Sequence, residues 1–113
     1  MRSFARLGIS VIHQSTVGDN RERLLAQLKE AADRSDIIIL SGGLGPTPDD
    51  LTKEVCCEFF GKKMFLHEPT VEKIKTYFST KGMEMAQNNL KQAMLPKDCV
   101  IFPNDNGTAP GMA

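Results

Sequence analysis

The alternation of hydrophobic and polar positions predicts helices separated by short apolar runs. Leucines and alanines recur at helical spacing over 20–33, which predicts a helix with one apolar face. The unbroken run DIIIL at 36–40 predicts a strand covered on both faces, as in a parallel sheet. The other expected elements are the end of a helix at 1–7, a strand at 9–15, a helix that starts near Asp50 or Thr52 and stops before Gly61, a helix between Pro69 and Gly82, a helix at about 83–95 and a strand at 99–102.

Local signals at the ends of these elements support the boundaries. Asp19 and Glu22 form an acidic variant of the capping box ahead of the helix at 20–33. Gly8 and Gly82 stand where a C-terminal cap belongs, and Pro69 suits a first helical turn. A domain rarely begins inside a helix that is about to end, so we expect that a preceding segment has been cut off.

The order of the elements predicts the class of fold. Strands that alternate with helices imply an α/β sandwich with a largely parallel sheet. Three expected strands, at 9–15, 36–40 and 99–102, make a thin sheet for so many helices. We therefore expect one domain over 1–113 whose complete form contains one or two further strands.

Composition excludes several classes of protein. Lys plus Arg and Asp plus Glu number 14 each, and the net charge of zero argues against a nucleic-acid-binding surface. The sequence shows neither a membrane-spanning run nor a signal peptide, so we expect no membrane partner. The cysteines, Cys56, Cys57 and Cys99, are odd in number and lack zinc-ligand spacing, which favours reduced thiols in the cytoplasm.

The segment SGGLGPTPDD at 41–50 is the main candidate for chemistry. It follows the expected strand 36–40, and ligands of open α/β sheets bind beyond the carboxyl ends of strands. Its glycines allow close backbone approach, and the next helix N-terminus favours an anion. Asp49 and Asp50 are hard oxygen ligands that suit a divalent cation. From the loop alone, a tight turn in which Asp50 or Thr52 caps the helix is an equal alternative.

Three motifs together resemble a known family. SGGLGPTPDDLTKE is similar to the signature of the molybdopterin-binding domain superfamily, and more narrowly to the N-terminal domain of the competence/damage-inducible protein A (CinA) family. VGDNRERL at 17–24 resembles the segment that precedes the signature strand there. NNLKQAMLP at 88–96 and NDNGTAPGM at 104–112 resemble its downstream helix and loop. The resemblance covers nearly the whole chain.

The resemblance implies a fold and a chemistry. The fold is the MoaB/MogA-like three-layer α/β/α sandwich with a mostly parallel sheet, here incomplete at both ends, because the family's first strand and the segment after GTAPG are missing. CinA-type domains are associated with metal-dependent hydrolysis of ADP-ribose to AMP and ribose 5-phosphate, using Mg²⁺, Mn²⁺ or Co²⁺. The broader superfamily binds and adenylylates molybdopterin, and a non-catalytic nucleotide-binding or assembly domain is the third alternative. The resemblance also suggests a homo-oligomer, and many CinA-type proteins carry a C-terminal amidohydrolase domain.

Residue roles follow from the same resemblance. Asp50 matches the superfamily's essential aspartate, so it is expected to bind the metal or orient water, and Asp49 is a second candidate catalytic residue and ligand. An exposed acidic residue in a turn, without a role in the site, explains Asp49 nearly as well. The residues expected to meet the nucleotide or pterin are Gly42, Gly43, Gly45, Thr47, Asn89, Gly107, Thr108 and Gly111.

Each of these roles has a plainer alternative. The glycines at 42–45 also suit turn geometry alone. Asn89 and Gln92 lie three apart and either read a base or belong to a solvated helix face. The NGTAPG loop at 106–111 also suits a surface turn. Lys53 either steadies a phosphate or is a solvated residue of the first helical turn.

Overall fold

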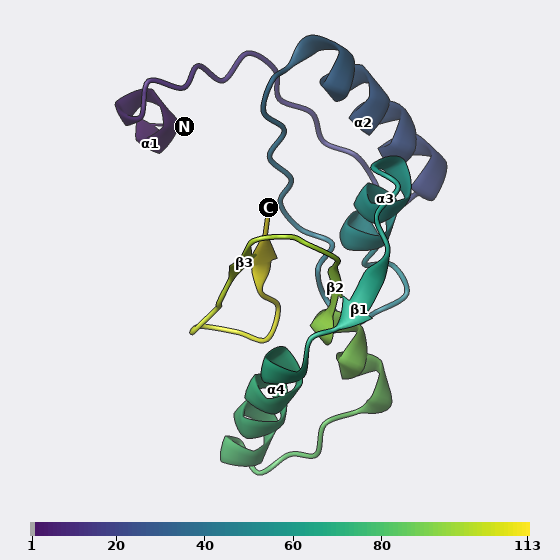
Figure 1. The fold of residues 1–113 in the computed structure, drawn as a ribbon, viewed down its shortest axis with the longest axis vertical. Helices are drawn as coiled ribbons and strands as arrows, with labels where there is room; N and C mark the ends of the chain where they lie inside the picture. Colours follow the sequence, from purple (N-terminus) through teal and green to yellow (C-terminus); the bar gives the residue numbers. More distant parts are fainter. Residues whose placement is uncertain (1) are drawn as a thin grey trace.

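The computed structural model describes residues 2–113, with side chains from Ser3 onward. The molecule is elongated, with extents of 45 × 33 × 26 Å. The elements are the helices α1 (Arg2–Arg6), α2 (Arg21–Arg34), α3 (Thr52–Phe59) and α4 (Glu68–Thr80), the 3-10 helix η1 (Gln87–Ala93), and the strands β1 (Met64–Leu66), β2 (Met94–Pro96), β3 (Ile101–Phe102) and β4 (Gly111–Met112) (Figure 1).

Two groups of helices are joined by a short ladder. α2 packs against α3 at one end, and α4 packs against η1 at the other, with β1 and β2 between them (Figure 1). β1 and β2 are antiparallel, with Phe65 opposite Leu95. The main apolar cluster, formed by Val71, Ile74 and Ala93, lies where α4 meets η1. Burial of these side chains is what keeps η1 against α4.

The helix expected at 20–33 is confirmed as α2, but its cap is not the predicted one. Asn20 is the N-cap, and its Oδ1 accepts a hydrogen bond from the N–H of Arg23 at 3.0 Å. The expectation that Asp19 caps the helix is therefore wrong. An asparagine at this position satisfies an N–H group of the first turn that has no partner within the helix.

Asn20→Ala should lower the free energy of unfolding by about 1 kcal/mol, because the Arg23 N–H loses its acceptor. Urea denaturation measures this difference. Asp19→Ala is the matched control one residue earlier, and it should cost less than about 0.5 kcal/mol. Equal losses in the two variants would contradict the assignment of the cap.

The expected helices after Asp50 and after Pro69 are confirmed as α3 and α4. Gly82 follows α4 with a φ of 68°, and Gly8 follows α1 with a φ of 74°. Both glycines therefore hold the left-handed conformation that ends a helix without steric cost. The expected helix tail at 1–7 corresponds to α1.

The helix expected over 83–95 is wrong at both ends. The structure has the short η1 helix followed by β2, which pairs with β1, a strand that was not expected. Leu95 is fully buried in this ladder, and the N–H of His67 donates to the Ala93 carbonyl at 2.8 Å. Pairing with β1 thus overrides a helical pattern that is locally plausible.

The strands expected at 9–15 and 36–40 are not formed. Both segments run without regular secondary structure, and Ile37 and Ile39 are about 60% exposed. Across residues 2–113 both ladders are antiparallel and two-stranded, so the expected parallel pairing is absent there. A strand requires backbone hydrogen bonds to a neighbouring strand. Within residues 2–113, neither segment has a backbone hydrogen bond to another strand.

The strand expected at 99–102 is confirmed in its second half. Ile101 and Phe102 pair with β4, and two further bonds of 2.7 and 2.9 Å join Val100 to Ala113.

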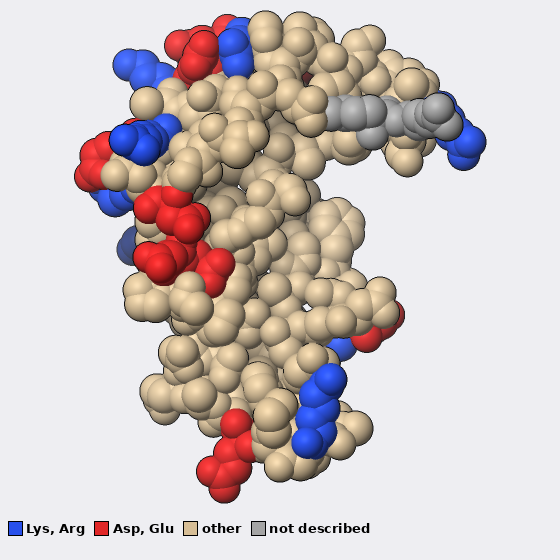
Figure 2. Space-filling model, turned by 180° about the vertical axis from the view of Figure 1, so that it is seen from behind, with Lys and Arg blue, Asp and Glu red and all other residues tan. Residues whose placement is uncertain are grey.

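Seen from behind, the middle of the molecule presents a broad uncharged surface, with charged side chains toward its edges (Figure 2). Among the helices described, none is long and apolar enough to cross a membrane.

Candidate functional site

The last four residues of the 41–50 loop form a closed turn. Oδ2 of Asp50 accepts hydrogen bonds from the N–H of Thr47 at 3.0 Å and from its hydroxyl at 2.7 Å. The N–H of Asp50 donates back to the Thr47 carbonyl at 3.1 Å. Asp50 therefore does not cap α3, whose N-cap is Leu51 and has no side-chain cap bond. The Thr47 hydroxyl thus orients the Asp50 carboxylate, while its contact with the nucleotide or pterin stays a prediction.

Two glycines of the loop are required by its geometry. Gly43 has a φ of 70°, and a Cβ placed on it would lie 2.0 Å from Oγ1 of Thr52. A Cβ on Gly45 would lie 2.6 Å from Oδ2 of Asp50. Gly42 also has a positive φ, of 90°, but faces open space. The loop thus folds closely over the start of α3 and over Asp50 because side chains are missing at 43 and 45.

The environment of Asp50 favours its ionised form. The Thr47 hydroxyl first, and then the Thr47 backbone N–H, hold the pKa of the Asp50 carboxyl below its ordinary value of 3.8. A metal ligand must be deprotonated, so Asp50 is available as a ligand at neutral pH. Asp49, next to it, is exposed.

Thr47→Val should raise the pKa of the Asp50 carboxyl toward its ordinary value, because the strongest donor to the carboxylate is lost. Carbon-13 NMR titration of the carboxyl measures the pKa directly. A folded-state pKa below the unfolded one stabilises the protein above the unfolded pKa. This stability is lost as the pH falls through the lowered folded value. Thr76→Val in α4 is the control, and an unchanged Asp50 titration in Thr47→Val would contradict the assignment.

Two lysines support the loop, and sequence reasoning missed one of them. Nζ of Lys91 donates to the Thr47 carbonyl at 2.6 Å and to the Asp50 carbonyl. Lys53 is only 5% exposed, and its Nζ donates to the Lys91 carbonyl at 2.7 Å. Burial lowers the pKa of Lys53. The reading of Lys53 as a solvated residue is therefore wrong, and its contact with a phosphate stays a prediction. No sequence spacing links residue 91 to residue 47.

Asn89 and Gln92 are buried, at 8% and 4% exposure, so the solvated-face reading is wrong. Oδ1 of Asn89 accepts from the N–H of Ala86 at 3.1 Å and so holds the start of η1. Oε1 of Gln92 is buried without a partner among the described residues, as is Oε2 of Glu54. Asn89 thus has a local structural contact, and its contact with the nucleotide or pterin stays a prediction.

The second predicted loop is built around Asn104. Its Nδ2 donates to the Ala109 carbonyl at 3.0 Å, and a Cβ on Gly107 would lie 3.1 Å from that nitrogen. Thr108 lies half-buried in the same loop, and Gly111 belongs to β4. An ion pair of 3.0 Å from Lys73 to Asp105 ties the loop to α4. Within residues 2–113 no hydrogen bond or ion pair joins it to the 41–50 loop, so the two are not brought together directly.

The donor set fits a lightly coordinated cation rather than a closed protein cage. Over the described chain, no group of three or more acidic, histidine or cysteine side chains is placed to hold a metal. Asp49 and Asp50 supply two adjacent carboxylates, one of them half-buried and held ionised. Mg²⁺ keeps several waters and binds through one or two carboxylates together with substrate phosphates. The residues present suit that mode of binding.

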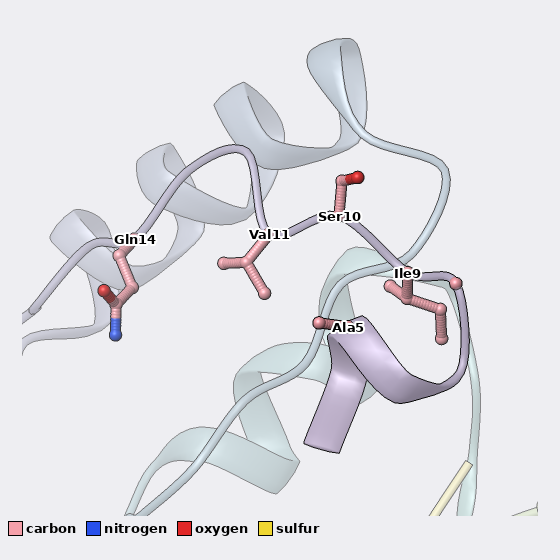
Figure 3. Close-up of a pocket in the computed structure, with 6 residues that line it drawn as sticks. Ala5, Ile9, Ser10, Val11 and Gln14 are labelled. Carbon is pink, nitrogen blue, oxygen red and sulfur yellow. The ribbon is translucent and has the colours of Figure 1, made fainter. Parts of the chain in front are cut away.

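One open hollow lies away from the 41–50 loop. It measures about 460 Å³ and is lined by Ala5, Gly8, Ile9, Ser10, Val11 and Gln14. These residues come from α1 and the extended segment after it, and the hollow is open, with no ionisable side chain at its wall (Figure 3). It therefore lacks the chemistry of the 41–50 loop.

Comparison with known proteins identifies the family. Residues 1–112 match the family described as "Probable molybdopterin binding domain". The chain belongs to this family. The resemblance found in the three motifs is thereby confirmed, and the 41–50 loop lies within the matched region.

Similar proteins carry CinA names. A "Putative competence-damage inducible protein" of Clostridioides difficile (strain 630) is 53% identical over 97% of this chain and 26% of its own length. A "CinA-like protein" of Dictyoglomus thermophilum is 51% identical over 98% of this chain and 27% of its own length. The chain thus spans about a quarter of the length of these relatives.

A solved structure confirms the predicted α/β class of fold, although the expected parallel pairing is not formed within residues 2–113. It is that of the protein CinA, described as of unknown function, from Thermoplasma acidophilum. It matches with a TM-score of 0.83 and 30% identity, over 98% of this chain and 64% of that one. The chain therefore has the MoaB/MogA-like α/β fold.

Proposed function

We propose that this chain carries the nucleotide- and metal-binding loop of a metal-dependent hydrolase that cleaves ADP-ribose to AMP and ribose 5-phosphate. The observation that carries the proposal is the ionised Asp50 carboxylate, held by Thr47 at the end of a glycine-rich loop. The CinA names of the relatives and the GGLGPTPDD motif support the same branch of the family.

The glycine segment suits an anionic ligand. Within residues 2–113 no protein acceptor receives the N–H groups of Gly42, Gly43 or Leu44. Backbone N–H groups with small or absent side chains are well suited to phosphate oxygens. These three donors therefore support binding of a pyrophosphate beside Asp50.

The carboxylates would hold the metal. Asp50 and Asp49 are the ligands that this chain offers to Mg²⁺, Mn²⁺ or Co²⁺. A bound divalent ion neutralises phosphate charge and lowers the pKa of its water. In the net reaction, water adds to one phosphorus of the pyrophosphate and the bridging P–O bond breaks. The chain's own part is to place the carboxylates and to bind the phosphates through the loop amides.

Incubation of the protein with ADP-ribose and each of the three metals tests the proposal. AMP and ribose 5-phosphate in equal amounts, and none after chelation of the metal, are expected. The absence of AMP with every metal would contradict the proposed hydrolase activity. Binding of ADP-ribose without AMP release would instead support a non-catalytic nucleotide-binding domain.

Molybdopterin binding is the second candidate, favoured by the description of the matched family. Isothermal titration of the protein with a pterin and with ADP-ribose separates the two. We expect ADP-ribose to bind more tightly, and tighter pterin binding would reverse the ranking. Light scattering after size-exclusion chromatography tests the further proposal of a homo-oligomer.

A further inference from the structure

The ammonium group of Lys91 lies beside the 41–50 loop and is bonded to the loop backbone. It donates to the carbonyls of Thr47 and Asp50, and it lies 3.7 Å from Oε1 of Glu54. An ammonium has three N–H donors, and the two carbonyls take two of them. The Glu54 carboxylate pairs with the same ammonium at a distance beyond hydrogen bonding, so the contacts of Lys91 are with the protein.

Lys53 holds the backbone of Lys91 in place. It reaches from α3 and donates to the Lys91 carbonyl from a site that is almost fully buried. A buried ammonium without a partner is costly, so this bond is strongly favoured once α3 and η1 pack together. We call the set formed by Lys53, Glu54 and Lys91 with the two loop carbonyls the lysine clasp.

The clasp gives the loop a fixed orientation. In the clasp, the carbonyl groups of Thr47 and Asp50 accept hydrogen bonds from Lys91. The amides of the preceding residues have no acceptor within 2–113; these are Gly42, Gly43 and Leu44. The turn that holds the Asp50 carboxylate is bonded to η1, an element more than 40 positions away in the sequence. Charge-assisted hydrogen bonds are about twice as strong as neutral ones, so this attachment is strong for so short a turn.

We propose that Lys91 is a positioning residue that orders the 41–50 loop on η1, and thereby aims the Asp50 carboxylate and the glycine amides before any ligand binds. Lys53 positions Lys91 in turn. The inference concerns the order of the loop and does not depend on which ligand the loop takes.

Hydrogen–deuterium exchange of the protein, without nucleotide or metal, tests the proposal. Three backbone amides report on the loop. The Thr47 amide donates to the Asp50 carboxylate, and the Asp50 amide donates to the Thr47 carbonyl. The Thr52 amide donates to the Gly43 carbonyl. In Lys91→Met these amides should exchange about tenfold faster or more, because the turn loses its attachment. The amides of α4 should keep their rates. Lys91→Arg, which retains charged donors, should restore much of the protection.

Lys97→Met is the matched control, because Lys97 is exposed and lies shortly after η1. It should leave exchange in the loop unchanged. Wild-type exchange in Lys91→Met, an equal increase throughout α4, or no rescue by arginine would each overturn the proposal. If Lys91→Met does not fold, Lys91→Gln, which keeps two uncharged donors, is measured by the same criteria. Failure of ADP-ribose hydrolysis in the wild type would count against the proposed function only, since exchange is recorded without substrate.

Discussion

Asp50→Ala should lower the rate of AMP release from ADP-ribose by about a thousandfold or more. The substitution removes the carboxylate that we assign to the metal, and the electrostatic groups at a reacting phosphate supply a large part of catalysis. It also removes the acceptor of both Thr47 bonds, so the closed turn opens. Initial rates of AMP formation by liquid chromatography measure the effect.

Asp33→Ala is the control for loss of a carboxylate, because Asp33 lies exposed on α2. Its rate should match the wild type within about twofold. Circular dichroism of Asp50→Ala should retain the helical signal, so that a loss of rate reflects the site. Full activity in a folded Asp50→Ala protein would remove Asp50 from the mechanism.

Gly43→Ala should lower the free energy of unfolding by about 3 kcal/mol. The new Cβ would stand 2.0 Å from the Thr52 hydroxyl, and the residue would have to keep a φ of 70°. Strained left-handed backbone and an overpacked contact each cost about 1–3 kcal/mol. Urea denaturation measures the loss of stability. The added Cβ should also move the loop away from Thr52.

Gly18→Ala is the matched control for this glycine. It lies in the irregular segment before α2, its added Cβ would meet nothing within 4 Å, and its φ is not in the left-handed region. We expect a change of less than about 0.5 kcal/mol there. Comparable losses at 18 and 43 would show that the close approach to Thr52 is not what requires Gly43.

Several features of the fold follow from local sequence alone. α2, α3 and α4 were predictable because helical periodicity and end signals such as Pro69 and Gly82 act within a few residues. The 41–50 loop was also predictable as the candidate site, since its glycines, its paired acids and its family motif are contiguous. Among the end signals of these helices, the cap of α2 was misplaced by one position, at Asp19 instead of Asn20.

Other features depend on partners distant in sequence. The helical pattern at 83–95 gives way to η1 and β2 because Leu95 gains burial by pairing with Phe65. The runs at 9–15 and 36–40 have the composition of strands, yet a strand also requires a neighbour, and none pairs with them within 2–113. Composition predicts a preference for extended backbone but not the ladder.

The sequence by itself determined the family, the helices α2, α3 and α4, and the position of the glycine and aspartate loop, because each is encoded by adjacent residues. Only the tertiary structure decided how that loop is held. Lys91 reaches Thr47 and Asp50 across more than 40 positions, and Lys53 is buried against the Lys91 carbonyl. Hydrogen bonds of this kind arise only when packing brings α3 and η1 together, so the local pattern of residues does not predict them.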